Sequence, residues 1–167
     1  MKWLACCLLL LSSLSCKKER SNDRVEIYLL KSFSIVLNPS TPETVTITQA
    51  KLENTPLVSN RDIVYYKQSE YLFKLKKNIK PLIRDFSGDK GFAVTVNNQP
   101  VYYGLFHPAF LSSIRFGVAT IDPVVFTTDN SVSMQYANFN NNPQLTQLDK
   151  RNDPRILNAM SASGRLR

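Results

Sequence analysis

The segment 91–106, GFAVTVNNQPVYYGLF, constrains the fold more than any other part of the sequence. Apolar residues alternate with their neighbours on both sides of Asn97-Asn98, two residues that tolerate a positive φ in a tight turn. This pattern predicts a β-hairpin. The chain is therefore expected to be built around antiparallel sheet.

Several other segments have the apolar alternation or the β-branched content of strands. They lie at 25–37, which is expected to form one strand or two, and at 44–52, 71–75, 114–121 and 132–136. We expect 44–52 to lie at a sheet edge. The four residues 59–62 have the side chains of a capping box over one short helical turn. The asparagine-rich residues 138–143 are expected to form a loop.

Two further segments have the spacing and the caps of short helices. In 79–86, apolar residues recur at i, i+3, i+4 and i+7. Near the end of the chain, Asp153 can cap a helix, Pro154 can take its first position and Gly164 can end it. The sequence therefore predicts an α+β fold. We expect a strand-rich single domain over 25–167, with a mostly antiparallel sheet and two short helices.

The first fifteen residues have the three-part layout of a secretory signal. One lysine is followed by an apolar run over 3–11 and then by small and apolar residues up to Cys16. The run is about half of the roughly 20 apolar residues that cross a bilayer, so a permanent membrane helix is not expected. We expect 1–15 to be removed as a signal peptide, and residues 16–24 to form a lipidated, flexible tether ahead of the domain.

Leu14-Ser15-Cys16, followed at once by Lys17, resembles the lipobox of bacterial lipoproteins, although Ser13 stands where that family prefers Leu, Val or Ile. The resemblance implies cleavage before Cys16, a diacylglycerol on its thiol and a fatty acyl chain, such as palmitate, on its new amine. Two or three acyl chains are enough for stable membrane anchoring. The resemblance also implies the cell envelope, and the outer membrane if the host has two membranes, because Lys17 rather than Asp follows the cysteine. A plain secretory signal cut nearby is the alternative.

All three cysteines, Cys6, Cys7 and Cys16, lie in the signal or at the lipid site. The domain therefore has neither a disulfide nor a free thiol, and it must be stabilised by its core. The net charge of +8 becomes +7 when Lys2 is lost with the signal. A basic domain is attracted to an anionic membrane or envelope polymer, although basic residues also commonly form a solvated surface. Nucleic acid is not an expected partner of an exported protein.

The sequence offers few residues for catalysis. His107 is the only histidine, and the carboxylates do not cluster at the spacing of metal ligands. We therefore predict no catalytic residue, no metal and no cofactor, and we do not expect an enzyme. One alternative stays open, a hydrolase of envelope material that uses two carboxylates brought together by the fold. The carboxylates include Glu26, Glu43, Glu53 and Glu70.

Aromatic residues around the histidine give the one binding hypothesis. The candidate ligand-binding residues are Tyr102, Tyr103, Phe106, His107 and Phe110. If one hairpin face is exposed, Tyr102 and His107 form a stacking surface for a sugar or peptide; otherwise the cluster is core and edge cover. The expected function is binding or structural support, with an envelope protein or anionic polymer as partner. A third alternative is an inhibitor or accessory subunit that inserts the hairpin tip or the asparagine-rich loop into its partner.

Two segments, 91–106 and 149–156, are similar to parts of small bacterial lipoproteins whose activity is not assigned. This resemblance agrees with the lipobox in pointing to a lipoprotein. It carries no known activity, so no site is transferred from it.

Overall fold

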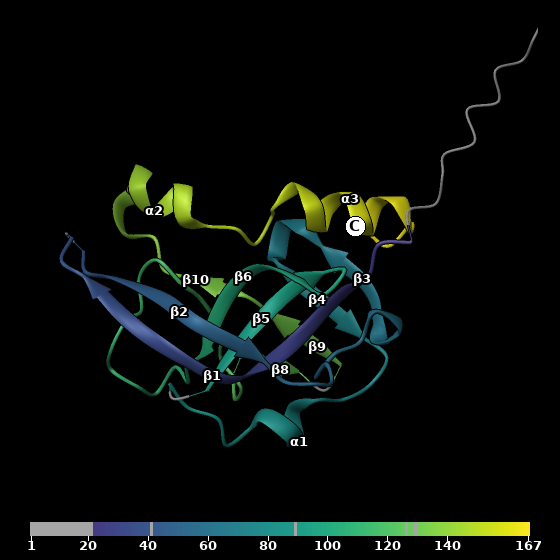
Figure 1. Cartoon of the computed structure of the whole chain (residues 1–167), viewed down its shortest axis with the longest axis horizontal. Helices are drawn as coiled ribbons and strands as arrows, with labels where there is room; N and C mark the ends of the chain where they lie inside the picture. The colour runs from purple at the N-terminus through teal and green to yellow at the C-terminus, as the bar shows by residue number, and fades with distance from the viewer. Residues whose placement is uncertain (1–21, 41, 89, 126, 129) are drawn as a thin grey trace, which may run out of the picture.

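The structure is a computed structural model that describes residues 22–167 apart from 41, 89, 126 and 129. The signal segment 1–15 and Cys16 lie outside the described residues. The described strands form mostly antiparallel sheets and are joined by three short α-helices, which confirms the strand-rich α+β class (Figure 1). In detail the chain differs from the expectation, because its strands are divided between two sheets and a third helix is present.

The larger sheet has six strands in the order β10-β7-β6-β5-β1-β2. Its members are β1 (Val25–Asn38), β2 (Thr44–Leu52), β5 (Gly91–Val96), β6 (Gln99–Phe106), β7 (Ala119–Ile121) and β10 (Gln135–Tyr136). Neighbouring strands are antiparallel except β6 and β7, which are parallel. The smaller sheet has the order β3-β4-β9-β8 and is antiparallel throughout. Its members are β3 (Ile63–Lys67), β4 (Leu72–Leu75), β8 (Thr127–Thr128) and β9 (Ser131–Ser133).

The hairpin predicted from the alternating pattern is confirmed as β5 and β6. Its turn residues Asn97 and Asn98 have φ angles of 52° and 64°. The segment 25–37 forms part of one long strand, β1, whose first half pairs with β5 and whose second half pairs with β2. The pairing register of β1 shifts between Leu30 and Ser34, where the strand changes partner. Bulges of this kind bend a strand without ending it.

The remaining strand predictions are confirmed to different extents. The segment 44–52 is β2, at the edge of the larger sheet. Of the segment 114–121, only Ala119–Ile121 forms a strand, since Gly117 has a φ of +77° and packs closely against Thr44. The segment 132–136 is divided between β9 and β10, so the chain passes from one sheet to the other within a few residues.

Two of the three helices follow the prediction. α1 (Lys80–Ile83) is shorter than the expected 79–86, and the Asn78 side chain accepts a hydrogen bond from the Lys80 amide at 2.9 Å. α3 (Pro154–Ala162) has the Asp153 side chain as its cap, at 3.0 Å from the Arg155 amide, and it is followed by Gly164 at a φ of +70°.

The third helix, α2 (Pro143–Leu148), was not predicted, and it begins at the last residue of the loop expected at 138–143. A short 3-10 turn (Phe139–Asn141) comes first, and the Asn142 side chain then caps the helix by accepting from the Gln144 amide at 2.9 Å. Asn142-Pro143 is the same cap and first-position pair as Asp153-Pro154. The surrounding asparagines, which favour loops, concealed it.

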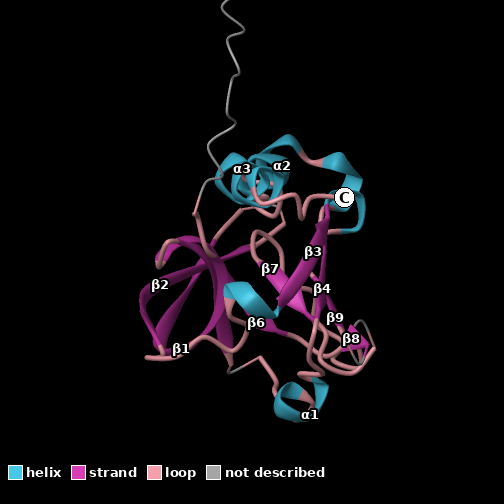
Figure 2. Cartoon of the chain, turned by 90° about the vertical axis from the view of Figure 1, so that its right-hand side faces the viewer, coloured by secondary structure: helices cyan, strands magenta, loops and turns pink. Residues whose placement is uncertain are grey.

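Two apolar clusters lie on opposite faces of the larger sheet. Cluster 1 draws on both sheets, α1 and α3, and its largest fully buried side chains include Tyr66, Phe73, Phe92 and Phe106. Cluster 2 lies on the other face and includes Leu30, Val45, Ile47, Ala93, Leu105 and Val118. In Figures 1 and 2, α2 and α3 lie on one side of the molecule and α1 lies on the opposite side. Among the described residues, no helix is long and apolar enough to cross a membrane.

The C-terminal residues cover the free edge of β3 (Figure 2). Tyr66 and Leu166 form a parallel bridge, with the Tyr66 amide 2.8 Å from the carbonyl of Arg165. The guanidinium of Arg165 also donates to the carbonyl and the side-chain oxygen of Asn60, both at 2.7 Å. The last residues of the described chain are therefore part of the folded structure.

Candidate binding pocket beside His107

The aromatic residues predicted to form a ligand site do not share one surface. Tyr102 and Phe106 point into cluster 1, and Tyr102 is only 8% exposed. Tyr103 points to the opposite face and packs against cluster 2, because successive residues of β6 alternate between faces. Phe110, in contrast, is 75% exposed. Tyr102 therefore offers no stacking surface beside His107, and the cluster is mostly core.

His107 begins a connection between two parallel strands. Because β6 and β7 are parallel, the segment 107–118 must carry the chain back to the same end of the sheet. The His107 amide donates to the Ile121 carbonyl at 2.9 Å, and its ring Nε2 lies 2.6 Å from the Ser113 carbonyl. A carbonyl only accepts, so Nε2 carries the hydrogen. Among the described residues the ring Nδ1 has no hydrogen-bond partner, although it is shielded from solvent.

Asp122 holds two turns together at this end of the sheet. Its side chain is almost fully buried. One oxygen accepts from the Ala109 amide at 2.8 Å, and the other accepts from the Val124 and Val125 amides at 2.7 and 2.9 Å. These charge-assisted hydrogen bonds fix the turn at 108–111 beside the turn at 122–125. The sequence pattern alone does not single out Asp122.

A pocket of about 310 Å³ opens between this connection and strands β7 and β10. Its polar lining is His107, Ser113, Arg115, Thr120, Asp122, Gln135 and Tyr136. Its apolar lining includes Leu111 and Ile114. Arg115 is half-buried, and no hydrogen bond or ion pair joins its side chain to the described residues, with Nε shielded from solvent. The pocket thus combines apolar walls with a cation that has no partner within the described chain.

Apolar side chains are exposed on the loops that carry this pocket. We call them the apolar loop surface: Phe110, Leu111, Ile114, Val124 and Val125. Ile114 is 65% exposed and Val125 is 60% exposed. Asp122 holds the backbone of the two loops together at Ala109 and at Val124 and Val125. Large apolar patches on a protein surface commonly mark binding sites.

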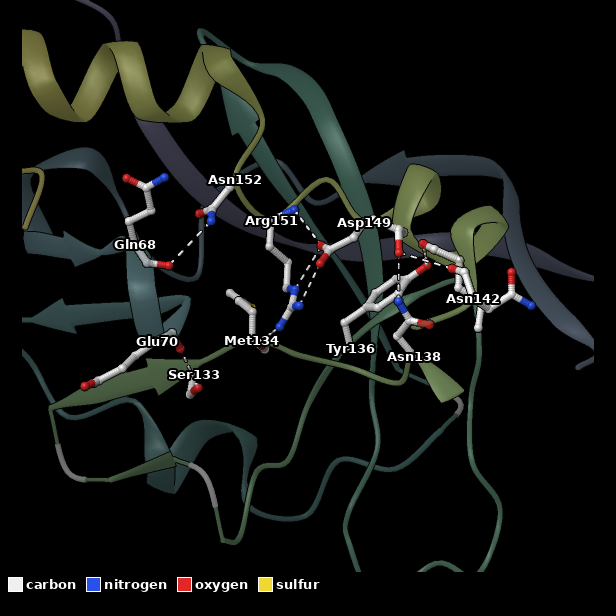
Figure 3. Close-up of polar contacts among 12 residues, drawn as sticks. Gln68, Glu70, Ser133, Met134, Tyr136, Asn138, Asn142, Asp149, Arg151 and Asn152 are labelled. Atoms are coloured by element: carbon white, nitrogen blue, oxygen red, sulfur yellow. Dashed lines mark hydrogen bonds and ion pairs between the residues drawn. The ribbon is translucent and has the colours of Figure 1, made fainter. Parts of the chain in front are cut away.

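A second polar cluster surrounds Arg151, whose side chain is mostly buried (Figure 3). The buried Arg151 side chain makes a two-point ion pair with Asp149, at 2.9 and 2.7 Å, and donates to the Met134 carbonyl at 2.8 Å. Its guanidinium carbon lies 3.5 Å from the centre of the Tyr71 ring. Burial raises the pKa of the neighbouring Tyr136 to about 12, with the charge of Asp149 adding to the effect. Arg151 is fully engaged inside the protein, so it is not available to an anionic polymer.

The carboxylates of the described residues do not form an obvious catalytic pair. The pocket beside His107 is lined by one carboxylate, Asp122. Of three other surface pockets, one is lined by Glu70, one by Asp23 and one by no carboxylate. No group of three or more His, Cys, Asp or Glu residues in the described chain is placed to hold a metal ion. The hydrolase alternative therefore gains no supporting observation.

The hairpin tip is held in place. The Asn97 side chain donates to Asp23 at 2.7 Å and accepts from the Arg24 amide at 2.9 Å, while Asn98 accepts from the Tyr28 hydroxyl at 3.3 Å. Large exposed apolar side chains gather in the 107–125 region, whereas the asparagine-rich loop contributes Phe139 alone. If a loop inserts into a partner, the 107–125 region is better equipped for it than the hairpin tip.

Comparisons of the chain with protein-family models, with curated proteins and with solved structures find no match.

Proposed function

We propose that this chain is a lipoprotein of the bacterial cell envelope, anchored through a lipidated Cys16, and that its domain acts by binding. The observation that carries the binding part is the apolar loop surface around the pocket beside His107. Exposed apolar side chains on loops are costly in water and are common where partners bind. A catalytic role has no comparable support, since the described pockets lack paired carboxylates.

The sequence supports the anchoring part. Leu14-Ser15-Cys16 closes an apolar run and is followed by charged residues, as in a lipobox. β1 begins at Val25, so the tether from Cys16 spans at most about 30 Å, near 3.4 Å per extended residue. The domain is then held close to the membrane surface. Replacement of the cysteine, Cys16→Ser, is expected to leave an uncleaved precursor without lipid.

The binding part can be tested in intact cells with a photocrosslinking amino acid in place of Phe110. The matched control carries the same amino acid in place of Leu82, a residue on α1 that is also well exposed. We expect a discrete crosslinked product at position 110 that is absent at position 82. A further substitution, Ile114→Ser, is expected to weaken the crosslink at position 110, because Ile114 belongs to the same surface. Equal products at both positions, or none at position 110, would contradict the proposal.

The apolar loop surface also favours one form of this function, an accessory subunit of an envelope complex. In that case the crosslinked product has the mass of a second protein. A product with a small molecule or a lipid instead places the function in ligand binding.

A further inference from the structure

We infer that the pocket beside His107 receives a small anionic group carried on an apolar body, such as the terminal carboxylate of a fatty acid or of a peptide. This inference rests on the proposed binding function and adds the chemistry of the ligand. It follows from three features of the pocket: its charge, its walls and its size.

The charge of the pocket comes from Arg115. Other partly or fully buried arginines of the described chain have partners: Arg151 pairs with Asp149, and Arg165 donates to Asn60. The Arg115 side chain has none among the described residues, although it is half-buried. A cation that is partly removed from water without a partner is costly, and an anion that binds beside it removes that cost. The guanidinium group suits a carboxylate because its donors match the two oxygens.

Asp122 lines the same pocket and is therefore a candidate ion-pair partner for Arg115. Its two oxygens accept hydrogen bonds from three backbone amides, whose partial positive charges offset the carboxylate. Among the ion pairs of the described residues, none joins Asp122 to Arg115, so the guanidinium remains available to a ligand.

The walls and the size of the pocket set the rest of the ligand. Leu111 and Ile114 line it, and their exposed side chains continue into the apolar loop surface. An apolar body beyond the anionic group would cover them. The volume of about 310 Å³ is near the lower end of the range for ligand pockets. It fits a head group and a few carbons instead of a large cofactor.

His107 provides the means of testing this, because it is the only histidine in the chain and lines the pocket. The ring signals of histidine-labelled full chain, held in lipid nanodiscs, can be followed by NMR during titration with four probes. Hexanoate is compared with 1-hexanol, and N-acetyl-leucine is compared with its neutral amide. We expect saturable shifts with the two acids and affinities at least about tenfold weaker for the neutral partners, the effect of one charged hydrogen-bonded contact. Whichever of the two acids binds more tightly indicates whether the carboxylate of the natural ligand belongs to a fatty acid or to the end of a peptide.

Variants at Arg115 complete the test. Arg115→Gln is expected to weaken the acids about tenfold, whereas Arg115→Lys retains part of the affinity because it keeps the charge. The control is Arg84→Gln, which removes an exposed arginine paired with Asp85. A titration in which hexanol binds as well as hexanoate, or in which Arg115→Gln has no effect, would overturn the inference about charge. Crosslinking at position 110 would remain, so that result leaves the proposed binding function standing.

Discussion

Two arginines show how differently the two regions of this protein are built. Arg151 pairs with Asp149, donates to the Met134 carbonyl and places its guanidinium over the Tyr71 ring. Arg115, beside the pocket, has no partner among the described residues. An aspartate stands two residues before Arg151, whereas Ser113 stands two residues before Arg115. The contacts of Arg151 stabilise its region, whereas Arg115, unpartnered among the described residues, is the basis of the proposal that the region around His107 binds a ligand.

The largest expected effect is on stability, from Arg151→Ala. Removing one partner of a buried ion pair costs about 3 kcal/mol or more, because the other charge is left buried. The free energy of unfolding, from urea titration, measures the loss. The matched control is Arg155→Ala, which also lies two residues after an aspartate, Asp153, but whose side chain is 54% exposed. It should cost less than about 1 kcal/mol. Equal losses for the two variants would remove the contrast on which the comparison depends.

The next effect concerns the loops of the pocket. Asp122→Ala removes the acceptor of three backbone amides, which should cost about 2 kcal/mol and loosen both turns. Hydrogen exchange at the Val124 and Val125 amides should become faster, while exchange in β5 and β6 changes only with global stability. Unchanged protection of Val124 and Val125 would show that Asp122 does not hold the loops.

A third prediction concerns the free energy of unfolding at low pH. Burial alone would raise the pKa of Asp62, but hydrogen bonds from the Ser59 hydroxyl and amide, together with Lys77, lower it to about 2. Because this pKa is depressed in the folded state, its contribution is complete above the unfolded value of about 3.9 and is lost as the pH falls towards 2. After allowance for solvent screening, the loss is about 1 kcal/mol. Asp62→Asn should remove that part of the pH dependence, and an identical acid profile would contradict it.

The smallest effect is expected from Tyr102→Phe. The Tyr102 hydroxyl is buried and has no hydrogen-bond partner among the described residues, so its removal should leave the free energy of unfolding unchanged or slightly raise it. The control is Tyr66→Phe. The Tyr66 hydroxyl donates to the Arg151 carbonyl at 2.9 Å, and its loss should cost about 1 kcal/mol. A clear destabilisation by Tyr102→Phe would mean that the hydroxyl has a partner after all.

Local signals explain which parts of the fold could be predicted. The hairpin with Asn97-Asn98 and the helix after Asp153 depend on residues that are close in sequence, so pattern and caps were enough. The division of strands into two sheets depends on pairing between distant segments, which the sequence alone does not reveal. The cap of α2, Asn142, lies in an asparagine-rich segment typical of loops, so the sequence pattern does not predict this helix.

The structure separates the residues that the sequence nominated for a ligand site. Of these residues, His107 lines the pocket, and Phe110 is exposed on the loop that follows it. The sequence also identified Tyr102 and Phe106, which are core residues, because alternation along a strand does not tell which face is buried. Arg115 and Asp122 were missed, since their significance depends on whether distant groups approach them.

The intact mass of the protein extracted from membranes tests whether lipid on Cys16 holds this domain at a membrane. We expect a mass equal to residues 16–167 plus a diacylglycerol and an acyl chain. A mass without lipid, from a chain cut elsewhere or not at all, would contradict the anchor. The binding surface would then belong to a freely secreted domain.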